Sequence, residues 1–500
     1  MGKGADRAGE LETADSLLED YFSCFRQNII GNRQSFVSPF GTKEIIYADW
    51  TASGRAYRPI EEKLMNEILP FVANTHTEAT VTGTKMSAAY ADAKRVVKKH
   101  VNATREDVLL FCGSGMTAAV NKLQRLQGWR LPEAIMQGSG NGGDRFLQGD
   151  ENLRPVVFIT HMEHHSNQVS WLETIADVEI INAASDGNVD LHHFEYLMSK
   201  YRKRVVKVAA VTACSNVTGI ETPYHEIAKR IHSQGGYCFV DFACSAPYVL
   251  MDMHPQDPEA GLDAIYFSPH KFLGGPGTPG ILVFNRKIYD NKVPDHPGGG
   301  TITYSNPWQG RDYVVDIEER EDGGTPPFLG AIKASFCIQL KERMGVENMQ
   351  NREKELLDIV FKRFADIRNI AVLEKGYRKR LGVVSFIVKD IHYNLFVKML
   401  NDRFGIQTRG GCSCAGTYGH YMLEIDAGRS AEIREQLRSG NRLIKPGWVR
   451  LSLHPCMTNK EIDFIMDAIE LTANNAQEWI NDYYYDEQTG NFICRRRDVC

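Results

Sequence analysis

Short apolar runs that alternate with helical stretches restrict the fold of this chain more than any other feature. Each run is about four to eight residues long, which is typical of buried strands. The runs are Asp107–Cys112, Pro155–Thr160, Val205–Thr212, Tyr237–Asp241, Ala264–Phe267 and Gly280–Phe284. Apolar residues recur at helical spacing over 85–101 and 224–234. Strands that alternate with helices favour a mainly parallel sheet, so we predict an α/β fold.

The chain of 500 residues is long enough for two or three hydrophobic cores. After about Pro327 the pattern changes to a long helical region over 330–370, then strands at 383–388 and 448–452 and a closing helix from Asn459. The predicted parts are an N-terminal helical extension (1–45), a large domain (46–325), a smaller C-terminal α+β domain (326–485) and a tail (486–500). Residues 137–150, which are rich in glycine, and residues 416–447 are interpreted as insertions.

Charge and composition exclude several classes of partner. The net charge of −5 offers no basic surface for nucleic acid. No apolar run approaches the roughly 18 residues that a membrane span requires, and the N-terminus lacks the apolar core of a signal peptide. The 11 cysteines are scattered, which favours reduced thiols over a disulfide framework. We therefore expect a soluble, cytoplasmic enzyme without a membrane or nucleic-acid partner, and an organelle remains open.

Lys271 and Asp241 follow two of the predicted strands. Lys271 ends the sequence Phe-Ser-Pro-His-Lys after the strand over 264–267, and Asp241 ends the apolar strand that begins at Tyr237. Open α/β sheets bind ligands at this edge. Pyridoxal 5′-phosphate (PLP) needs a lysine for its imine and an anion for its ring nitrogen, and these two residues supply both. The simpler alternatives are a surface lysine and a helix-capping aspartate.

A glycine-rich turn offers the third requirement of that cofactor, a phosphate site. Residues 113–117 read Gly-Ser-Gly-Met-Thr between a predicted strand and a predicted helix. The first turn of a helix has free backbone N–H groups, and Thr117 adds a hydroxyl, so Met116 and Thr117 are candidate phosphate contacts. Helix capping alone would also explain the threonine.

Three longer motifs carry a family resemblance. Residues 162–171 read Met-Glu-His-His-Ser-Asn-Gln-Val-Ser-Trp, residues 268–271 read Ser-Pro-His-Lys and residues 409–415 read Arg-Gly-Gly-Cys-Ser-Cys-Ala. They resemble motifs of the class V aminotransferase group of fold type I PLP enzymes, in particular the cysteine desulfurases and selenocysteine lyases. With weaker matches over 47–52, 324–326 and 449–452, the resemblance spans about 45–470. It implies a large domain with a mainly parallel sheet of about seven strands.

The resemblance also implies roles for single residues. His164 stacks on the cofactor ring, Ser268 and His270 contact its phosphate, and Lys271 forms the imine. Arg409 faces the substrate carboxylate, and Cys414 accepts sulfur from L-cysteine, which leaves as L-alanine.

Three further residues follow in the same way. Asn216 touches the ring hydroxyl, Arg450 binds the substrate carboxylate, and Thr325 reaches the phosphate of a neighbouring subunit. A homodimer is therefore expected, and a sulfur-acceptor protein is a possible further partner.

The chain also departs from the family pattern. Cys244 stands where the family has a glutamine that touches the cofactor, Met116 stands where a threonine is usual, and Cys412 and Ser413 replace two histidines. Other functions therefore stay open. They are an aminotransferase or lyase that acts on another amino acid, with Cys414 idle as a small apolar residue, and an interaction protein that has lost its cofactor. A zinc site at Cys412, Cys414 and the histidines near His164 lacks a second ligand pair at the usual spacing, so no metal is expected.

Overall fold

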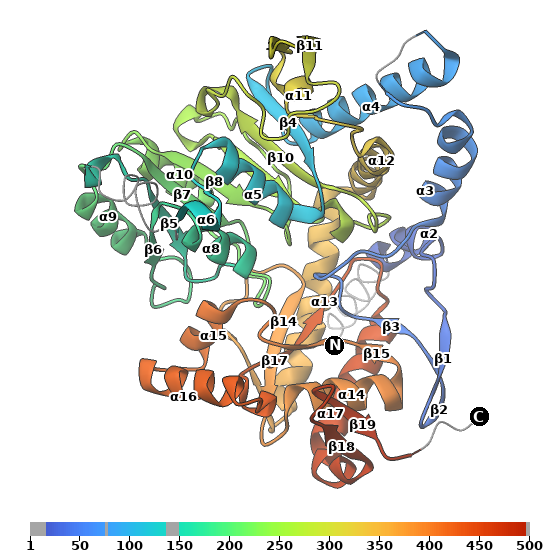
Figure 1. Ribbon diagram of the computed structural model, residues 1–500. Helices are drawn as coiled ribbons and strands as arrows, with labels where there is room; N and C mark the ends of the chain where they lie inside the picture. The colour runs from blue at the N-terminus through green and yellow to red at the C-terminus, as the bar shows by residue number, and fades with distance from the viewer. Residues whose placement is uncertain (1–16, 76–78, 137–149, 497–500) are drawn as a thin grey trace, which may run out of the picture. The chain divides into compact units, whose positions relative to one another are not determined.

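The computed structural model describes residues 17–75, 79–136 and 150–496 (Figure 1). They form two compact units. The central unit comprises Arg58–Ser215 and Glu221–Arg343. The split unit combines three segments, namely the described residues up to Tyr57, the short segment Asn216–Ile220, and the described residues from Met344 onward.

A seven-stranded sheet forms the core of the central unit, with strand order β4-β10-β9-β8-β7-β5-β6. The strands are β4 (Asp107–Cys112), β5 (Val156–Thr160), β6 (Asp177–Ile181), β7 (Lys207–Thr212), β8 (Tyr237–Asp241), β9 (Ala264–Phe267) and β10 (Gly280–Asn285). Neighbours from β9 to β6 pair in parallel, whereas β10 is antiparallel to both of its neighbours. The predicted α/β fold with a mainly parallel sheet is confirmed.

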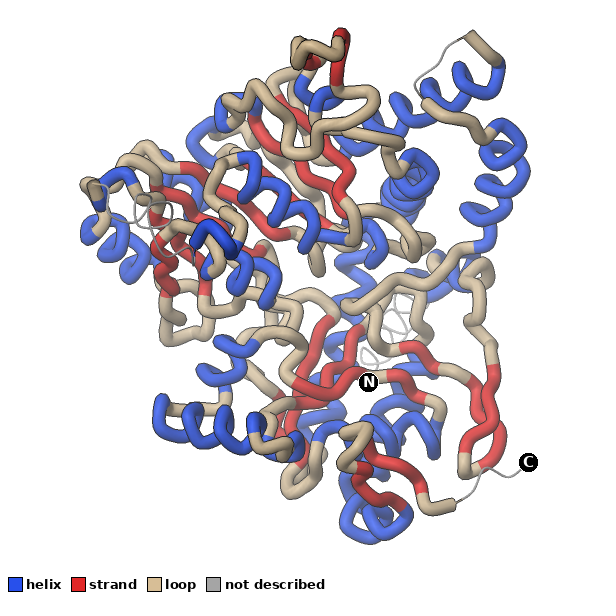
Figure 2. Tube along the Cα trace, viewed as in Figure 1, coloured by secondary structure: helices blue, strands red, loops and turns tan. Residues whose placement is uncertain are grey.

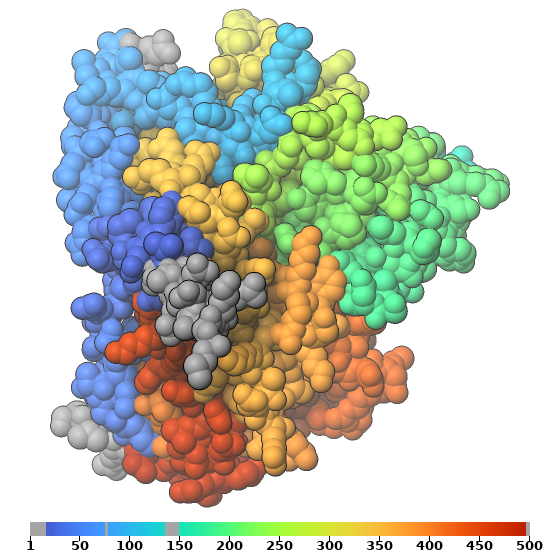
Figure 3. Space-filling model, turned by 180° about the vertical axis from the view of Figure 1, so that it is seen from behind, coloured from blue at the N-terminus to red at the C-terminus, as the bar shows by residue number. Residues whose placement is uncertain are grey.

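The central unit also contains helices, several of which cover this sheet, as the tube in Figure 2 shows. The helices are α3 (Arg58–Lys63), α4 (Val81–His100), α5 (Gly115–Leu126), α6 (Glu133–Met136), α8 (His165–Leu172), α9 (Leu191–Lys200), α10 (Tyr224–His232), α11 (Ile317–Arg320) and α12 (Phe328–Met344). Helix α12 lies beside α4 in the view from behind (Figure 3). Lys341 Nζ of α12 is 3.1 Å from His100 Nε2 of α4. The core between α5 and the sheet contains the fully buried Leu123, Trp171 and Phe239. A hairpin of β11 (Ile302–Ser305) and β12 (Arg311–Tyr313) is largely exposed.

The split unit is built on an antiparallel sheet with strand order β13-β14-β17-β16. The strands are β13 (Ile370–Val372), β14 (Val383–Val388), β16 (Arg409–Gly411) and β17 (Trp448–Ser452). The main helices are α13 (Val346–Asp366), α14 (Tyr393–Phe404) and α17 (Asn459–Trp479), and α17 begins with a capping box of Thr458 and Glu461. The N-terminal segment joins this unit because β3 (Ile46–Tyr47) pairs in parallel with β15 (Ile406–Gln407).

The structure differs from the expected parts at several places. The long helical region expected over 330–370 is two helices, because Gly345 has a φ of 74° and ends α12. The N-terminal extension contains the short helix α2 (Ser23–Arg26) and also a hairpin of β1 (Ser35–Ser38) and β2 (Gly41–Glu44). A second unpredicted hairpin, β18 (Tyr483–Asp486) with β19 (Asn491–Cys494), lies at the predicted tail.

The two predicted insertions have different outcomes. Residues 416–447 contain the helices α15 (Gly416–Met422) and α16 (Ala427–Arg438). The insertion over 137–150 lies outside the described residues except for its last position. Among the described helices, none is both long and apolar enough to cross a membrane.

Candidate active site

Three predicted site residues of the central unit lie at or just after the carboxyl ends of three parallel strands of the sheet. His164 follows β5, Asp241 is the last residue of β8, and Lys271 ends the 3-10 turn Pro269–Lys271 after β9. Strands β5, β7, β8 and β9 are consecutive in the sheet. The carboxyl ends of parallel strands meet at one edge of the sheet, where ligands bind in folds of this class. The structure therefore brings these three residues to one edge.

Asp241 is a buried acid without a strong compensating charge. Its side chain is 3% exposed, and its Oδ1 accepts a hydrogen bond from Ala243 N at 2.7 Å. Burial raises the pKa of Asp241 to about 6, although the hydrogen bond from Ala243 and the charge of Lys271 oppose the rise. A buried carboxylate is costly unless a cation pairs with it. The site is therefore suited to a ligand that presents a protonated ring nitrogen.

Glu163 is a second buried acid at this edge, and the sequence analysis missed it. Its carboxylate accepts hydrogen bonds from the backbone N–H of Thr160 (3.2 Å) and Thr212 (2.8 Å), and from Asn167 Nδ2 (2.8 Å). Burial raises the pKa of Glu163 to about 7, against these hydrogen bonds and with a contribution from the charge of Asp241. It ties the ends of β5 and β7 together directly before His164. The sequence did offer one signal for Glu163, which is an acidic residue soon after an apolar strand, where a carboxylate is costly unless it is paired.

His164 is held by its position at the start of a helix. It is the N-cap of α8, and its Nδ1 accepts a hydrogen bond from Ser166 N at 3.1 Å. This bond fixes the ring orientation and leaves the proton of the neutral ring on Nε2. An imidazole ring with a fixed orientation can cover a planar ligand.

The turn at the start of α5 forms a cradle with the loop after β9. Met116 N donates a hydrogen bond to Ser268 Oγ at 2.8 Å. Gly115 has a φ of 67°, and a Cβ added there would lie 2.9 Å from His270 Cε1 and 3.1 Å from Ser268 Oγ. Burial and the charge of Lys271 lower the pKa of His270 to about 4, so its ring is neutral at pH 7. Helix N-termini bind anions, and α5 is long enough to do so.

Thr117 and Thr325 are the two threonines that the sequence predicted as phosphate contacts. Thr117 Oγ1 is 2.7 Å from Ser166 Oγ, a hydrogen bond between α5 and α8 that the sequence did not predict. Thr325 is exposed in the segment that precedes α12.

Cys244 occupies the position where the resemblance expects a glutamine. Its thiol is buried and donates to Cys214 O, with the sulfur 3.0 Å from the oxygen. The thiol of a cysteine is a weaker hydrogen-bond donor than the amide of a glutamine, and the cysteine side chain is shorter. The contact that a glutamine would make with a ligand ring is therefore replaced by a small, weakly polar group.

The predicted carboxylate-binding arginines lie together in the split unit, on either side of Asp49. Arg409 Nε donates to Asp49 Oδ2 at 3.0 Å, and Arg450 Nη2 donates to Asp49 Oδ1 at 2.7 Å. The Arg409 side chain is 46% exposed and that of Arg450 is 3% exposed. Asp49 was not predicted, although it belongs to the motif over 47–52. Two arginines around one acid retain donors for a second carboxylate.

Asn216 connects these arginines to the cysteine loop. Its carbonyl oxygen accepts from Arg450 Nη1 at 3.0 Å, and its Nδ2 donates to Ser413 O at 2.7 Å. Its Oδ1 is buried and has no hydrogen-bond partner among the described residues. A buried amide oxygen without a partner is costly, so this atom is available to a ligand donor such as a ring hydroxyl.

Cys414 is exposed and lies in a tight turn. Cys412 O accepts from Ala415 N at 2.9 Å, and the two central residues of the turn, Ser413 and Cys414, have φ of 50° and 56°. Residues other than glycine in this region cost roughly 1–2 kcal/mol each. Such strain is often retained at functional sites.

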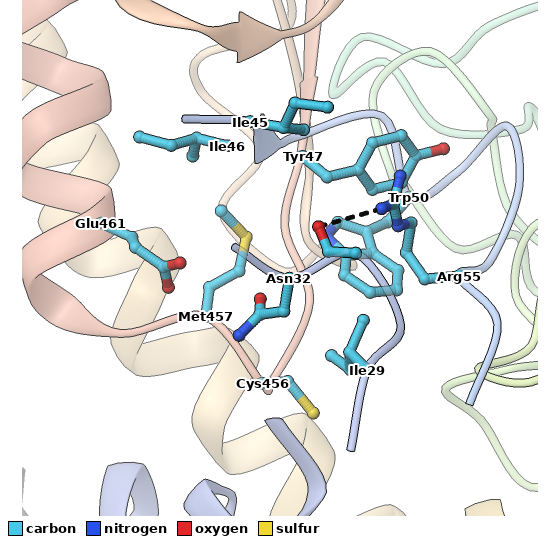
Figure 4. Close-up of a pocket in the computed structure, with 11 residues that line it drawn as sticks. Ile29, Asn32, Ile45, Ile46, Tyr47, Trp50, Arg55, Cys456, Met457 and Glu461 are labelled. Atoms are coloured by element: carbon cyan, nitrogen blue, oxygen red, sulfur yellow. Dashed lines mark hydrogen bonds between the residues drawn. The ribbon is translucent and has the colours of Figure 1, made fainter. Parts of the chain in front are cut away.

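A small cavity in the split unit lies beside the motif over 47–52 (Figure 4). Tyr47 and Trp50 line it, and Arg55 Nη2 donates to Gly31 O at 3.2 Å at its edge. Its volume of about 20 Å³ holds about one water molecule. It is too small for an amino acid and is not a candidate substrate site.

A family model extends these observations. The model of the class-V aminotransferases matches residues 144–465. This chain belongs to the class-V aminotransferase family. Its relatives include a probable cysteine desulfurase of Halalkalibacterium halodurans, 28% identical over 379 residues that cover 74% of this chain and 84% of that protein. A cysteine desulfurase of Haloferax volcanii is 27% identical over 439 residues, which cover 86% of this chain and 89% of that protein.

Solved structures with the same fold include two cysteine desulfurases. A cysteine desulfurase from Thermococcus onnurineus NA1 has a TM-score of 0.71 and 22% identity, covering 90% of this chain and 98% of that one. The cysteine desulfurase CsdA from Escherichia coli has a TM-score of 0.68 and 19% identity, covering 91% and 98%. The expected resemblance to class V enzymes and the fold that it implies are confirmed.

Proposed function

We propose that this class-V enzyme binds PLP and is a cysteine desulfurase, which converts L-cysteine to L-alanine and leaves sulfur on Cys414. The observation that carries the proposal is the edge of the central sheet, where a buried acid, a lysine and an anion cradle follow neighbouring strands. The names of the relatives favour L-cysteine as the substrate.

The residues of the central unit fit the cofactor. Lys271 would hold the aldehyde carbon through Nζ, and Asp241 would face the ring nitrogen, where a raised pKa shows that the acid lacks a strong cationic partner. The N–H groups at the start of α5, together with Ser268 and His270, would hold the phosphate. His164 would cover one face of the ring. When bound, PLP supplies an electron sink for charge that develops at the α-carbon of the substrate.

The residues of the split unit would orient the substrate. Arg409 is the more accessible arginine, and we assign it the carboxylate of the amino acid, with Arg450 as a second donor. Asp49 holds both guanidinium groups before the substrate binds, which lowers the entropy cost of their alignment. Asn216 Oδ1 is available to the ring hydroxyl.

Cys414 would accept the sulfur. Its thiolate attacks Sγ of the bound L-cysteine, an S–S bond forms, and the Cβ–Sγ bond breaks with its electron pair on carbon. Protonation of that carbon would give L-alanine, and Cys414 would carry a persulfide. The exposure of Cys414 also suits transfer of this sulfur to an acceptor protein.

A homodimer accompanies this proposal. Thr325 is exposed on its own subunit, so its hydroxyl is available to the phosphate of a second copy. Light scattering of the PLP-loaded protein tests this assembly. A monomer that holds PLP tightly would contradict the role of Thr325.

A comparison of substrates tests the function. The purified PLP-loaded protein is incubated with L-cysteine and a dithiol reductant, which releases persulfide sulfur as sulfide, and separately with other amino acids plus a keto acid. Alanine, sulfide and keto-acid conversion are measured. We expect alanine and sulfide from L-cysteine alone, loss of both in Cys414→Ala, and retention of both in Cys24→Ala, which removes another exposed thiol. Sulfide release that survives Cys414→Ala, or transamination of another amino acid, would exclude the proposal.

A further inference from the structure

The turn that carries Cys414 also carries a second thiol, Cys412. The hydrogen bond from Ala415 N to Cys412 O closes the turn at 2.9 Å, so Cys412 and Cys414 are its first and third residues. Consecutive Cα atoms lie about 3.8 Å apart, and residues two apart in a closed turn lie roughly 5–6 Å apart. This separation falls in the range that a disulfide spans.

Contacts on both sides hold this turn in place. Asn216 Nδ2 donates to Ser413 O at 2.7 Å, and Gly419 N donates to Ala415 O at 2.9 Å at the start of α15. Ser413 is buried between the two thiols. The turn therefore keeps Cys412 and Cys414 near each other whether or not Cys414 carries sulfur.

The two thiols differ in their surroundings. Cys414 is exposed, whereas Cys412 is half-buried. Tyr393 lies beside Cys412: burial raises the pKa of Tyr393 to about 12, and the nearby Cys412 contributes to the rise. Tyr393 also packs against Gly411, whose added Cβ would lie 3.9 Å from its ring. Cys414 is thus accessible from solvent, and Cys412 lies within reach of Cys414 in the same turn.

We propose that Cys412 is a second catalytic thiol, which resolves the persulfide of Cys414. Its thiolate attacks the sulfur bonded to Cβ of Cys414, a Cys412–Cys414 disulfide forms, and the terminal sulfur leaves as hydrosulfide with the electron pair of the broken S–S bond. The proton of the Cys412 thiol goes to solvent. This inference rests on the proposed function, because the persulfide comes from L-cysteine.

The step balances without an oxidant, because the persulfide already holds the oxidised sulfur. The enzyme then contains a disulfide, and a dithiol reductant from outside must supply two electrons to restore both thiols. The consequence is that sulfide leaves as a free product, and that each turnover depends on the reductant.

A single turnover with L-cysteine equimolar to the PLP-loaded enzyme tests the inference. Acid quenching, alkylation and trypsin then release residues 410–429, which contain Cys412 and Cys414 and no other cysteine. We expect the unmodified enzyme to give this peptide without two hydrogen atoms and closed to alkylation. In Cys412→Ser the same peptide should carry one extra sulfur atom on Cys414. Cys24→Ser is the control and should match the unmodified enzyme.

The outcomes separate the two proposals. If the unmodified enzyme and Cys412→Ser both retain the extra sulfur and neither forms the disulfide, Cys412 does not resolve the persulfide, although the proposed function stands. If no variant gains sulfur on this peptide and no alanine appears, the proposed function fails, and the inference fails with it. Thermal unfolding of Cys412→Ser checks that the variant is folded.

Discussion

Asp49 accepts a hydrogen bond from Arg450 at 2.7 Å, although 401 residues separate them in the chain. The Arg450 side chain is 3% exposed, and it also donates a hydrogen bond to the carbonyl oxygen of Asn216 at 3.0 Å. The guanidinium that we assign to the substrate carboxylate is therefore held by a residue from the opposite end of the sequence.

Replacement of Asp49 should weaken both stability and substrate binding. Asp49→Ala removes the carboxylate that accepts a hydrogen bond from the nearly buried Arg450. Breaking a buried pair costs about 3–5 kcal/mol, and we expect a smaller loss here because water reaches the Asp49 side chain. We expect a loss of about 1–3 kcal/mol in urea unfolding and a rise of roughly tenfold in KM for L-cysteine. Asp290→Ala, at an exposed position of the central unit, is the control. Unchanged stability and KM in Asp49→Ala would show that Asp49 does not organise the arginines.

The pH dependence of the cofactor-free protein should reveal Asp241. Its pKa rises from the ordinary 3.8 to about 6, so the folded state binds this proton more tightly than the unfolded state. The stability from this group is complete below about pH 4 and is lost as the pH rises through about 6. Asp241→Asn removes this loss, so its stability relative to the unmodified protein should rise by about 2 kcal/mol between about pH 4 and pH 7. Urea unfolding at both pH values measures it, and a constant difference would contradict the assignment.

In the PLP-loaded enzyme, Asp241→Asn should lower the catalytic rate, although it stabilises the cofactor-free protein at neutral pH. The variant should bind PLP, since the cradle and Lys271 are intact, but lose roughly a hundredfold or more of its rate, because an amide cannot keep the ring nitrogen protonated. Visible absorbance reports binding and alanine formation reports the rate. A rate within a few-fold of that of the unmodified enzyme would show that Asp241 does not face the ring nitrogen.

Alanine substitutions at two glycines distinguish the effect of steric crowding at the phosphate cradle from the effect of backbone strain alone. Gly115 has a φ of 67° and would place a Cβ 2.9 Å from His270, whereas Gly128 has a φ of 70° and nothing within 4 Å. Each alanine substitution costs about 1 kcal/mol for the left-handed backbone. Only Gly115→Ala should also weaken PLP binding, by about tenfold or more, as measured by a fluorescence titration. Equal PLP affinities in the two variants would place the phosphate elsewhere.

The strained turn at Cys414 predicts a stabilising substitution. Ser413 has a φ of 50°, and its Oγ is buried without a hydrogen-bond partner among the described residues. Ser413→Gly relieves both penalties and should raise the free energy of unfolding by about 1–2 kcal/mol. Glu424→Gly, at an exposed residue with a φ of 51°, should give only the backbone part. If both variants gain equally, the buried hydroxyl carries no cost.

Most strands of the central sheet can be predicted because each is a continuous apolar run. Strand β6 escapes this rule, since it lies at the sheet edge and carries Asp177 and Glu179, which form ion pairs. The acids that support the site are harder to find. The roles of Asp49 and Glu163 depend on partners that only the fold brings close to them. Arg409, for example, lies 360 residues from Asp49 in the sequence. Local spacing contains no signal for such pairs.

The split unit has a consequence for the order of folding during synthesis. Strand β3 finds its partner β15 only after the ribosome has made residue 407, and the hydrogen bond from Ser452 N to Ala48 O forms later still. The described N-terminal residues up to Tyr57 therefore cannot form these contacts until the whole central unit has been synthesised. Contacts between such distant residues slow folding, because the loop must close before it gains stability. A nascent chain stopped before β15 should expose these residues to protease or to a chaperone, while the central sheet is already complete.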